Sequence, residues 1–136
     1  MAEDIIEEAL NLFRPNIFAK SFDIRGPADR TLVYLLLYIG DCLCRIKPET
    51  SLVEAQRTLA NVSAQSFALP GEAGFPLNGM FPPAEDAEAL RNYLSGLRSE
   101  TATRLLARLY PDGATSSKPS ILWISYQKRK FMNKSL

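Results

Sequence analysis

The sequence predicts an all-α protein in which residues 1–136 form a single compact domain of about five helices, with one central buried helix surrounded by the others. Three observations predict this fold class. Apolar residues recur at helical spacing in most of the long segments. The run Leu32–Ile39 has no polar face, which is typical of a helix that is buried on all sides. Neither an internal repeat nor a convincing hairpin signal is present, so no sheet is expected.

The first helix is expected over residues 4–18. Acidic residues occupy its first turn, where the helix dipole favours them. Proline lacks a backbone N–H, so Pro15 should kink or end this helix near Arg14. Residues 22–27 should then form a turn. The apolar stripe of the helix consists of Ile6, Leu10, Phe13 and Ile17.

The central helix is expected from about Arg30 to Lys47, with Asp29 as its N-cap. It carries the two cysteines of the chain, Cys42 and Cys44. Two residues apart on a helix, their side chains point about 200° away from each other, so they cannot form a disulfide together. We therefore expect two reduced thiols, both buried as apolar groups.

A capping box, Ser51-x-x-Glu54, predicts the start of the next helix, whose inner stripe is Leu52, Ala55, Leu59 and Val62. Residues 68–83 follow it with four prolines and three glycines, and cannot be helical throughout. They also carry large apolar side chains, which favours a loop that lies against the domain or a partner. Within this loop we expect Phe75 and Leu77 to be packed.

The longest helix is expected from Ala84 to Tyr110, with Glu100 and Arg104 as a favourable pair one turn apart. Pro111-Asp112-Gly113 should end it. The last segment, Ser120 to Met132, favours a short helix over a strand. The apolar face of the long helix is Ala87, Leu90, Leu94, Leu97, Thr101, Leu105 and Leu109. The residues whose spacing favours a helix in the last segment are Ile121, Ile124, Lys128 and Phe131.

The charge balance argues against a nucleic-acid binder, because sixteen basic and fifteen acidic residues leave a net charge of only +1. The charges are unevenly distributed, however: residues 1–13 are acidic and residues 114–136 are basic. No apolar stretch approaches the roughly 20 residues that span a bilayer. The acidic start does not resemble a signal peptide, so a cytoplasmic protein without a membrane span is expected.

Catalytic equipment is not expected, because the chain contains no histidine and so lacks the usual general base and the commonest metal ligand. We predict no catalytic, cofactor-binding or metal-binding residue. Glu85, Asp86 and Glu88 lie at a helix start, where the dipole explains them. The glycines of the loop, Gly71, Gly74 and Gly79, lack the Gly-Lys-Ser/Thr ending of a phosphate-binding loop.

The most distinctive polar feature is the basic cluster Lys128, Arg129, Lys130 and Lys134. Such a cluster is a solvated surface, a surface that contacts a partner protein, or a site that contacts a membrane or nucleic acid. In the second case Phe131 would supply the apolar part of the contact. We hypothesise a partner contact formed by Lys128, Arg129, Lys130, Phe131 and Lys134.

Three stretches carry a resemblance to a known family: Ala28–Leu32 with Tyr34 and Tyr38 behind it, Leu69–Asn78, and Lys128–Leu136 preceded by Lys118-Pro119-Ser120. In them the chain resembles subunit 3 of the actin-related protein 2/3 complex, the assembly that nucleates branched actin filaments. The resemblance implies a helical, non-enzymatic subunit of the actin cytoskeleton, and not a functional homo-oligomer. The implied partners are the actin-related protein 3 subunit, the other subunits and the mother filament.

Some positions depart from the family pattern. Relatives have an additional segment ahead of Asp4, where this chain has only residues 1–3. Pro15 and Leu122 stand where a non-proline and a tryptophan are expected. Two alternative functions remain open: a free-standing helical adaptor that binds a partner peptide in a groove, and a small helical enzyme that uses carboxylates.

Overall fold

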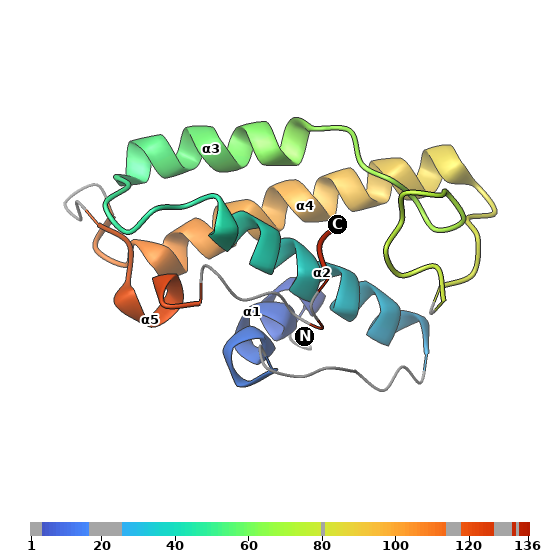
Figure 1. Ribbon diagram of the computed structural model, residues 1–136, viewed down its shortest axis with the longest axis horizontal. Coiled ribbons are helices and arrows are strands. Elements are labelled where there is room, and N and C mark those ends of the chain that lie inside the picture. The colour runs from blue at the N-terminus through green and yellow to red at the C-terminus, as the bar shows by residue number, and fades with distance from the viewer. Residues whose placement is uncertain (1–3, 17–25, 80, 114–117, 127–131, 133) are drawn as a thin grey trace.

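The structure, a computed structural model, describes residues 4–16, 26–79, 81–113, 118–126, 132 and 134–136. Within these ranges all the regular structure is helical, which confirms the all-α prediction. In Figure 1, α3 and α4 run side by side, α2 lies below α4, and α1 crosses beneath α2. The helices in chain order are α1 (Ile5–Asn16), α2 (Pro27–Cys44), α3 (Leu52–Ala64), α4 (Ala87–Leu109) and α5 (Ile121–Ile124).

The second helix, α2, is the centre of the fold. No residue of Leu32–Ile39 is more than 3% exposed. Helices α1 and α4 both pack against α2, and the loop that follows α3 covers a further part of it, since Phe75 stacks on Tyr34 with ring centroids 6.3 Å apart. The prediction of a central buried helix is confirmed.

The first helix has the predicted position. It runs to Asn16, two residues beyond Arg14, with the exposed Pro15 in its last turn. Ile6, Leu10 and Phe13 are buried as predicted. The predicted inner residue Ile17 and most of the predicted turn at residues 22–27 lie outside the described residues.

The prediction for the start of α2 was wrong by three residues. The helix begins at Pro27 with Gly26 as its N-cap, and Asp29 lies in its first turn without capping it. Proline suits the first helical position, because the N–H that it lacks would have no helical partner there and its φ is preset. A carboxylate in the first turn is still favoured by the helix dipole.

The far end of α2 also differs from the prediction. The helix ends at Cys44 rather than Lys47, where the N–H of its C-cap, Arg45, donates to the carbonyl of Cys42 and the N–H of Ile46 to that of Leu43. Neither cysteine is in a disulfide; Cys42 is buried, but Cys44 is exposed, contrary to the prediction. The reason is the angular separation of about 200°, which turns one side chain outward when the other faces the core.

Side-chain caps define the starts of the next two helices. At α3, the N–H of Glu54 donates to Ser51 Oγ at 3.3 Å, and that hydroxyl donates to the Glu54 carboxylate at 3.1 Å. At α4, the N–H of Ala89 donates to Asp86 Oδ1 at 3.1 Å, so α4 begins after this cap, at Ala87, rather than at Ala84. The capping box was predicted; the Asp86 cap was not.

The proline-rich loop between α3 and α4 is packed against α2. The two side chains predicted to pack, Phe75 and Leu77, are 4% and 1% exposed. Phe75 lies between Tyr34 and Phe81, whose ring meets it edge-on at a centroid distance of 5.3 Å. This loop therefore contributes apolar side chains to the same core as the helices.

Internal hydrogen bonds hold the loop in shape. The N–H of Gly71 donates to Asn78 Oδ1, and Asn78 Nδ2 donates to the carbonyl of Glu72, both at 2.7 Å. Gly71 has a φ of +97°, and a Cβ there would lie 3.1 Å from the Cβ of Pro83. Only glycine combines this backbone conformation with this close approach.

The last segment differs most from its prediction. Its described helix, α5, is one turn long, and Ile121 is 75% exposed instead of facing inward. Trp123 takes the core position, because its larger ring buries more apolar surface and stacks on Phe13 at 6.1 Å between centroids. Ile124 is buried as predicted. The predicted continuation through residues 127–131 lies outside the described residues.

Candidate partner-binding surface

The hypothesised contact residues fall mainly beyond what the structure describes. Lys128, Arg129, Lys130 and Phe131 lie outside the described residues, whereas Lys134 is described and half-buried. The partner contact therefore stays a prediction. The described residues that flank 127–131 can nevertheless be placed on the fold.

On its C-terminal side, the chain is attached to α2 by Asp41. Ser135 Oγ donates to Asp41 Oδ1 at 2.7 Å, and the N–H of Leu136 donates to Oδ2 at 2.9 Å. Met132 is buried, with a left-handed φ of 56°. Residues 134–136 thus lie at the surface of the central helix, which places Lys134 near α2.

On the N-terminal side, α5 presents two large apolar side chains to solvent. Ile121 is 75% exposed and Leu122 is 62% exposed. Their neighbour Trp123 is buried against Phe13, and the Arg14 guanidinium lies 5.3 Å from the centre of its indole. Because Trp123 holds α5 to α1, the exposed pair sits on an anchored turn, and adjacent exposed apolar residues are typical of interaction sites.

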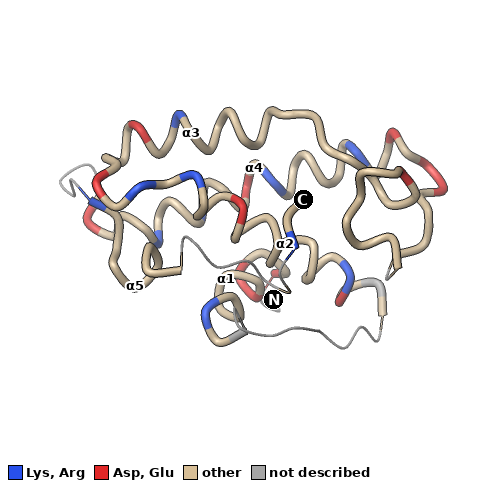
Figure 2. Tube along the Cα trace, in the orientation of Figure 1, with Lys and Arg blue, Asp and Glu red and all other residues tan. Residues whose placement is uncertain are grey.

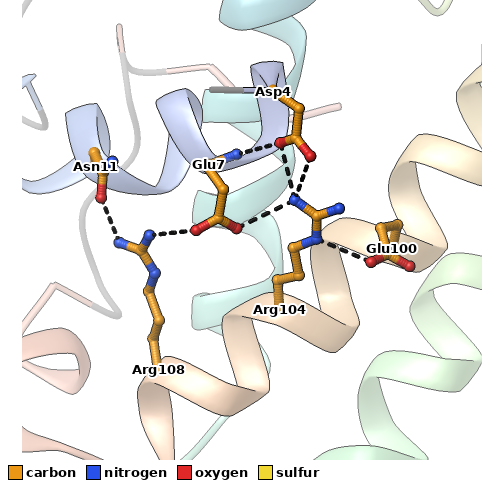
Figure 3. A network of polar contacts seen from close by, with 6 residues as sticks. All are labelled: Asp4, Glu7, Asn11, Glu100, Arg104 and Arg108. Carbon is orange, nitrogen blue, oxygen red and sulfur yellow. Dashed lines mark hydrogen bonds and ion pairs between the residues drawn. The ribbon is translucent and has the colours of Figure 1, made fainter. Parts of the chain in front are cut away.

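The acidic residues at the start of the chain are engaged within the fold. Arg104 on α4 donates to Asp4 Oδ2 at 2.7 Å, to Glu7 Oε2 at 3.2 Å and to Glu100 Oε1 at 2.9 Å (Figure 3). The last of these is the predicted pair one turn apart. The first two join α4 to α1 and could not be predicted from spacing.

One turn further along α4, Arg108 repeats this arrangement. It donates to Glu7 Oε1 at 3.0 Å and to Asn11 Oδ1 at 2.8 Å (Figure 3). Glu7 thus accepts from both arginines, one through each carboxylate oxygen. We call the contact formed by Asp4, Glu7, Asn11, Glu100, Arg104 and Arg108 the polar seam between α1 and α4.

The electrostatics of the polar seam follow from these contacts. The backbone N–H of Glu7, and then Arg104, lower the pKa of Asp4 below its ordinary value of 3.8. The hydrogen bonds that Arg104 donates to Asp4, and then to Glu100, raise the pKa of Arg104. Figure 2 shows acidic and basic residues scattered over the described chain. Asp4 and Glu7 are paired with arginines and so do not form a free acidic surface.

A groove of about 530 Å³ lies between α3 and α4. Its walls are apolar or small side chains, with Leu52, Leu59 and Ala60 on α3 and Ala102 and Leu106 on α4. Helix-in-groove recognition uses such surfaces. The groove is therefore the feature that a peptide-binding adaptor would use.

Catalytic chemistry finds no support in the described ranges. Within them no three His, Cys, Asp or Glu residues are grouped as metal ligands would be. Asp86 serves as the N-cap of α4, and Glu85 and Glu88 are exposed beside it. A search of the described helices for one long and apolar enough to cross a membrane found none.

Comparison with known proteins identifies the family. The sequence model described as "P21-Arc: ARP2/3 complex ARPC3 (21 kDa) subunit" matches residues 1–136. The chain belongs to the family of subunit 3 of the actin-related protein 2/3 complex. The resemblance seen in the sequence is thereby confirmed.

Three relatives, each named actin-related protein 2/3 complex subunit 3, show the extent of the similarity. The protein of Saccharomyces cerevisiae is 46% identical over 137 residues, covering 98% of this chain and 77% of the relative. That of Schizosaccharomyces pombe is 44% identical, with 98% and 76% covered. That of Arabidopsis thaliana is 41% identical, with 96% and 75% covered. The similarity thus spans nearly all of this subunit 3 chain.

Three features of the surface escaped the sequence reasoning. Nothing in the sequence pairs Asp41 with the end of the chain, because 94 residues separate it from Ser135. The outward direction of Ile121 was missed because the segment was taken as a longer helix. The exposure of Leu122 was likewise not predicted, since its place in the segment gives no sign of the side that it faces.

Proposed function

We propose that this chain is a non-catalytic structural subunit of the actin-related protein 2/3 complex and supports the nucleation of branched actin filaments. In this role it contacts the actin-related protein 3 subunit and the mother filament, in the cytoplasm at the actin cytoskeleton. The observation that carries the proposal is the match of the subunit 3 family over residues 1–136. The relatives, which are named as subunit 3 of the actin-related protein 2/3 complex, support membership in the same complex.

The proposed contact surface combines the basic segment with α5. Actin-type proteins expose many acidic side chains, and a local basic cluster steers and orients docking even when the net charge is small. The exposed Ile121 and Leu122 supply apolar contact area close to Trp123. An apolar centre with a charged rim is the usual composition of a protein interface.

Assembly is the first test. A complex prepared without its subunit 3 should recruit this chain and gain branching activity, measured by copurification and by counting filament branches under the microscope. The matched control is the same preparation with no added chain. Failure of the chain to copurify with the other subunits would contradict the proposal.

Charge reversal tests the contact surface itself. The double variant Lys128→Glu, Lys130→Glu should lower branching and weaken its salt dependence, because rim charges chiefly affect association. The matched control is Lys47→Glu, an exposed lysine just beyond the end of α2. Equal branching by both variants across a salt series, with helical content and assembly intact, would return the cluster to the solvated-surface interpretation.

The groove between α3 and α4 favours a second candidate, the free-standing peptide-binding adaptor. The two functions predict different behaviour of the isolated chain. An obligate subunit should self-associate through its uncovered apolar residues, and Ile121→Asp with Leu122→Asp should abolish this, as light scattering would show. An adaptor should stay monomeric and bind peptides in the groove, and Ala60→Trp should block that binding.

A further inference from the structure

One arginine of α4 is enclosed by the fold. Arg98 is 5% exposed. Its Nη1 donates to the Tyr34 hydroxyl at 3.3 Å and its Nη2 to the carbonyl of Val62 at 3.1 Å. The rings of Phe67 and Tyr38 lie 4.4 and 4.5 Å from its guanidinium carbon.

The charge of Arg98 forms no ion pair within the described part of the chain. Its Nε has no hydrogen-bond partner there. Of the five N–H donors of a guanidinium, only two are used in these hydrogen bonds. Buried charges are normally paired, because removing an ion from water is costly. Arg98 therefore keeps N–H donors for a further partner, in addition to the two aromatic rings that already face its charge.

A pocket lies directly beside this charge. Its volume is about 260 Å³, and Arg98 lines it together with Tyr38 and Asp41 of α2 and Phe67 of the following loop. Arg45, an exposed residue at the end of α2, adds a second positive charge to the lining. The carboxylate oxygens of Asp41 are already occupied by Ser135 and Leu136.

The lining distinguishes between kinds of anion. Val62, Phe67 and Ala68 form an apolar part of the wall, which favours an anion that carries methylene groups. Asp41 would repel a doubly charged phosphate more strongly than a singly charged carboxylate. A guanidinium with free N–H donors also matches the shape of a carboxylate.

We propose that this pocket receives an aspartate or glutamate side chain from a neighbouring subunit, whose carboxylate pairs with Arg98. The inference rests on the proposed function, since it requires an assembled complex. It adds a specific anchor on the face formed by α2, the end of α3 and the loop after it. The pocket lies beside the end of the chain, because Leu136 also lines it, whereas no residue of α5 does.

A structure of the assembled complex tests the proposal directly. The expected result is a carboxylate oxygen of another subunit within roughly 4 Å of the Arg98 guanidinium. Water, a phosphate ion or an apolar side chain in the pocket would overturn it. These outcomes leave the proposed function intact, whereas a chain that fails to assemble would refute that function first.

Binding measurements give a second test. Arg98→Gln should weaken the affinity of the chain for the rest of the complex at least about tenfold, because it leaves a partner carboxylate unpaired. Arg98→Lys should retain part of the affinity. The matched control, Arg57→Gln on the exposed surface of α3, should leave it unchanged.

The pH dependence separates pairing from a structural role. Binding of the wild type should weaken as the pH falls from 7 through the carboxyl range, and Arg98→Gln should reduce this dependence. All affinities are measured where circular dichroism shows each variant to be folded. Should Arg98→Gln not fold, Arg98→Lys must still show the pH dependence. A lower melting temperature with unchanged affinity and unchanged pH profile would overturn the proposal.

Discussion

Helix α1 meets its two neighbours in opposite ways. Toward α2 it presents Ile6, Ala9, Leu10 and Phe13, all no more than 5% exposed. Toward α4 it presents Asp4, Glu7 and Asn11, which form the polar seam and remain partly exposed. Apolar burial stabilises in proportion to area, whereas surface ion pairs contribute little. Thus the apolar contact with α2 holds α1 in place, while the polar seam with α4 fixes the orientation of α1.

The largest effect is expected from Phe13→Ala. Phe13 is fully buried, stacks on Trp123 and contacts α2, so its truncation should cost about 3–5 kcal/mol of unfolding free energy. Denaturant titration followed by circular dichroism measures it. Leu122→Ala, at a position 62% exposed, is the control and should be near neutral. A small loss for Phe13→Ala would mean that the polar seam, not the apolar contact, anchors α1.

Leu35→Ala and Leu36→Ala should each cost roughly 2–5 kcal/mol, because both residues are fully buried on α2. Neighbours on a helix project about 100° apart, so a helix with one wet face would spare one of them. Thermal and denaturant unfolding of both variants provide the measurement. A neutral result for either would contradict burial of α2 on all sides.

Gly40→Ala tests the α1–α2 contact by adding a methyl group instead of removing side-chain atoms. A Cβ at Gly40 would lie 3.6 Å from Cε1 of Phe13, an ordinary contact distance. Alanine also favours a helix interior over glycine, so the variant should be more stable by about 0.5–1 kcal/mol. A raised denaturation midpoint is the expected reading. Destabilisation would show that the α1–α2 contact has no room even for one methyl group.

The smallest effect is expected at the polar seam. Arg104→Gln should lower stability at low salt, and the loss should shrink as added salt screens the partly exposed charges. A loss that is the same at low and at high salt would contradict this account.

Lowering the pH should also reduce the stability that the polar seam contributes. Because the folded-state pKa of Asp4 is lowered, its contribution is complete above its ordinary value of 3.8 and disappears as the pH falls through the lower folded value. Comparing unfolding of the wild type and Arg104→Gln between pH 6 and 2 measures this. The two proteins should differ less at the acid end.

The sequence predicted those parts of the fold that depend on neighbouring residues. The uninterrupted apolar run made α2 central, and Ser51 with Glu54 identified the start of α3. Contacts between residues far apart in the chain could not be predicted in this way. For Arg104, helical spacing predicted the partner Glu100 but gave no indication of Asp4.

Arg98 shows the corresponding limit at the candidate pocket. A periodicity argument counts arginine as polar and places it outside, yet Arg98 is buried. Its spacing offered a signal, since it follows Leu94 by four residues and precedes Thr101 by three, both on the buried face. The contact predicted for Lys128, Arg129 and Lys130 stays a prediction.

The polar seam also has a consequence for the order of events during synthesis. Arg104 follows Asp4 by 100 residues, and Arg108 follows Glu7 by 101 residues. At ribosomal speeds of about 5–20 residues per second, α1 emerges roughly 5–20 s before the part of α4 that it contacts. Of the three helices that contact α1, namely α2, α4 and α5, only α2 has been made by then, so any earlier burial of the apolar side of α1 is against α2.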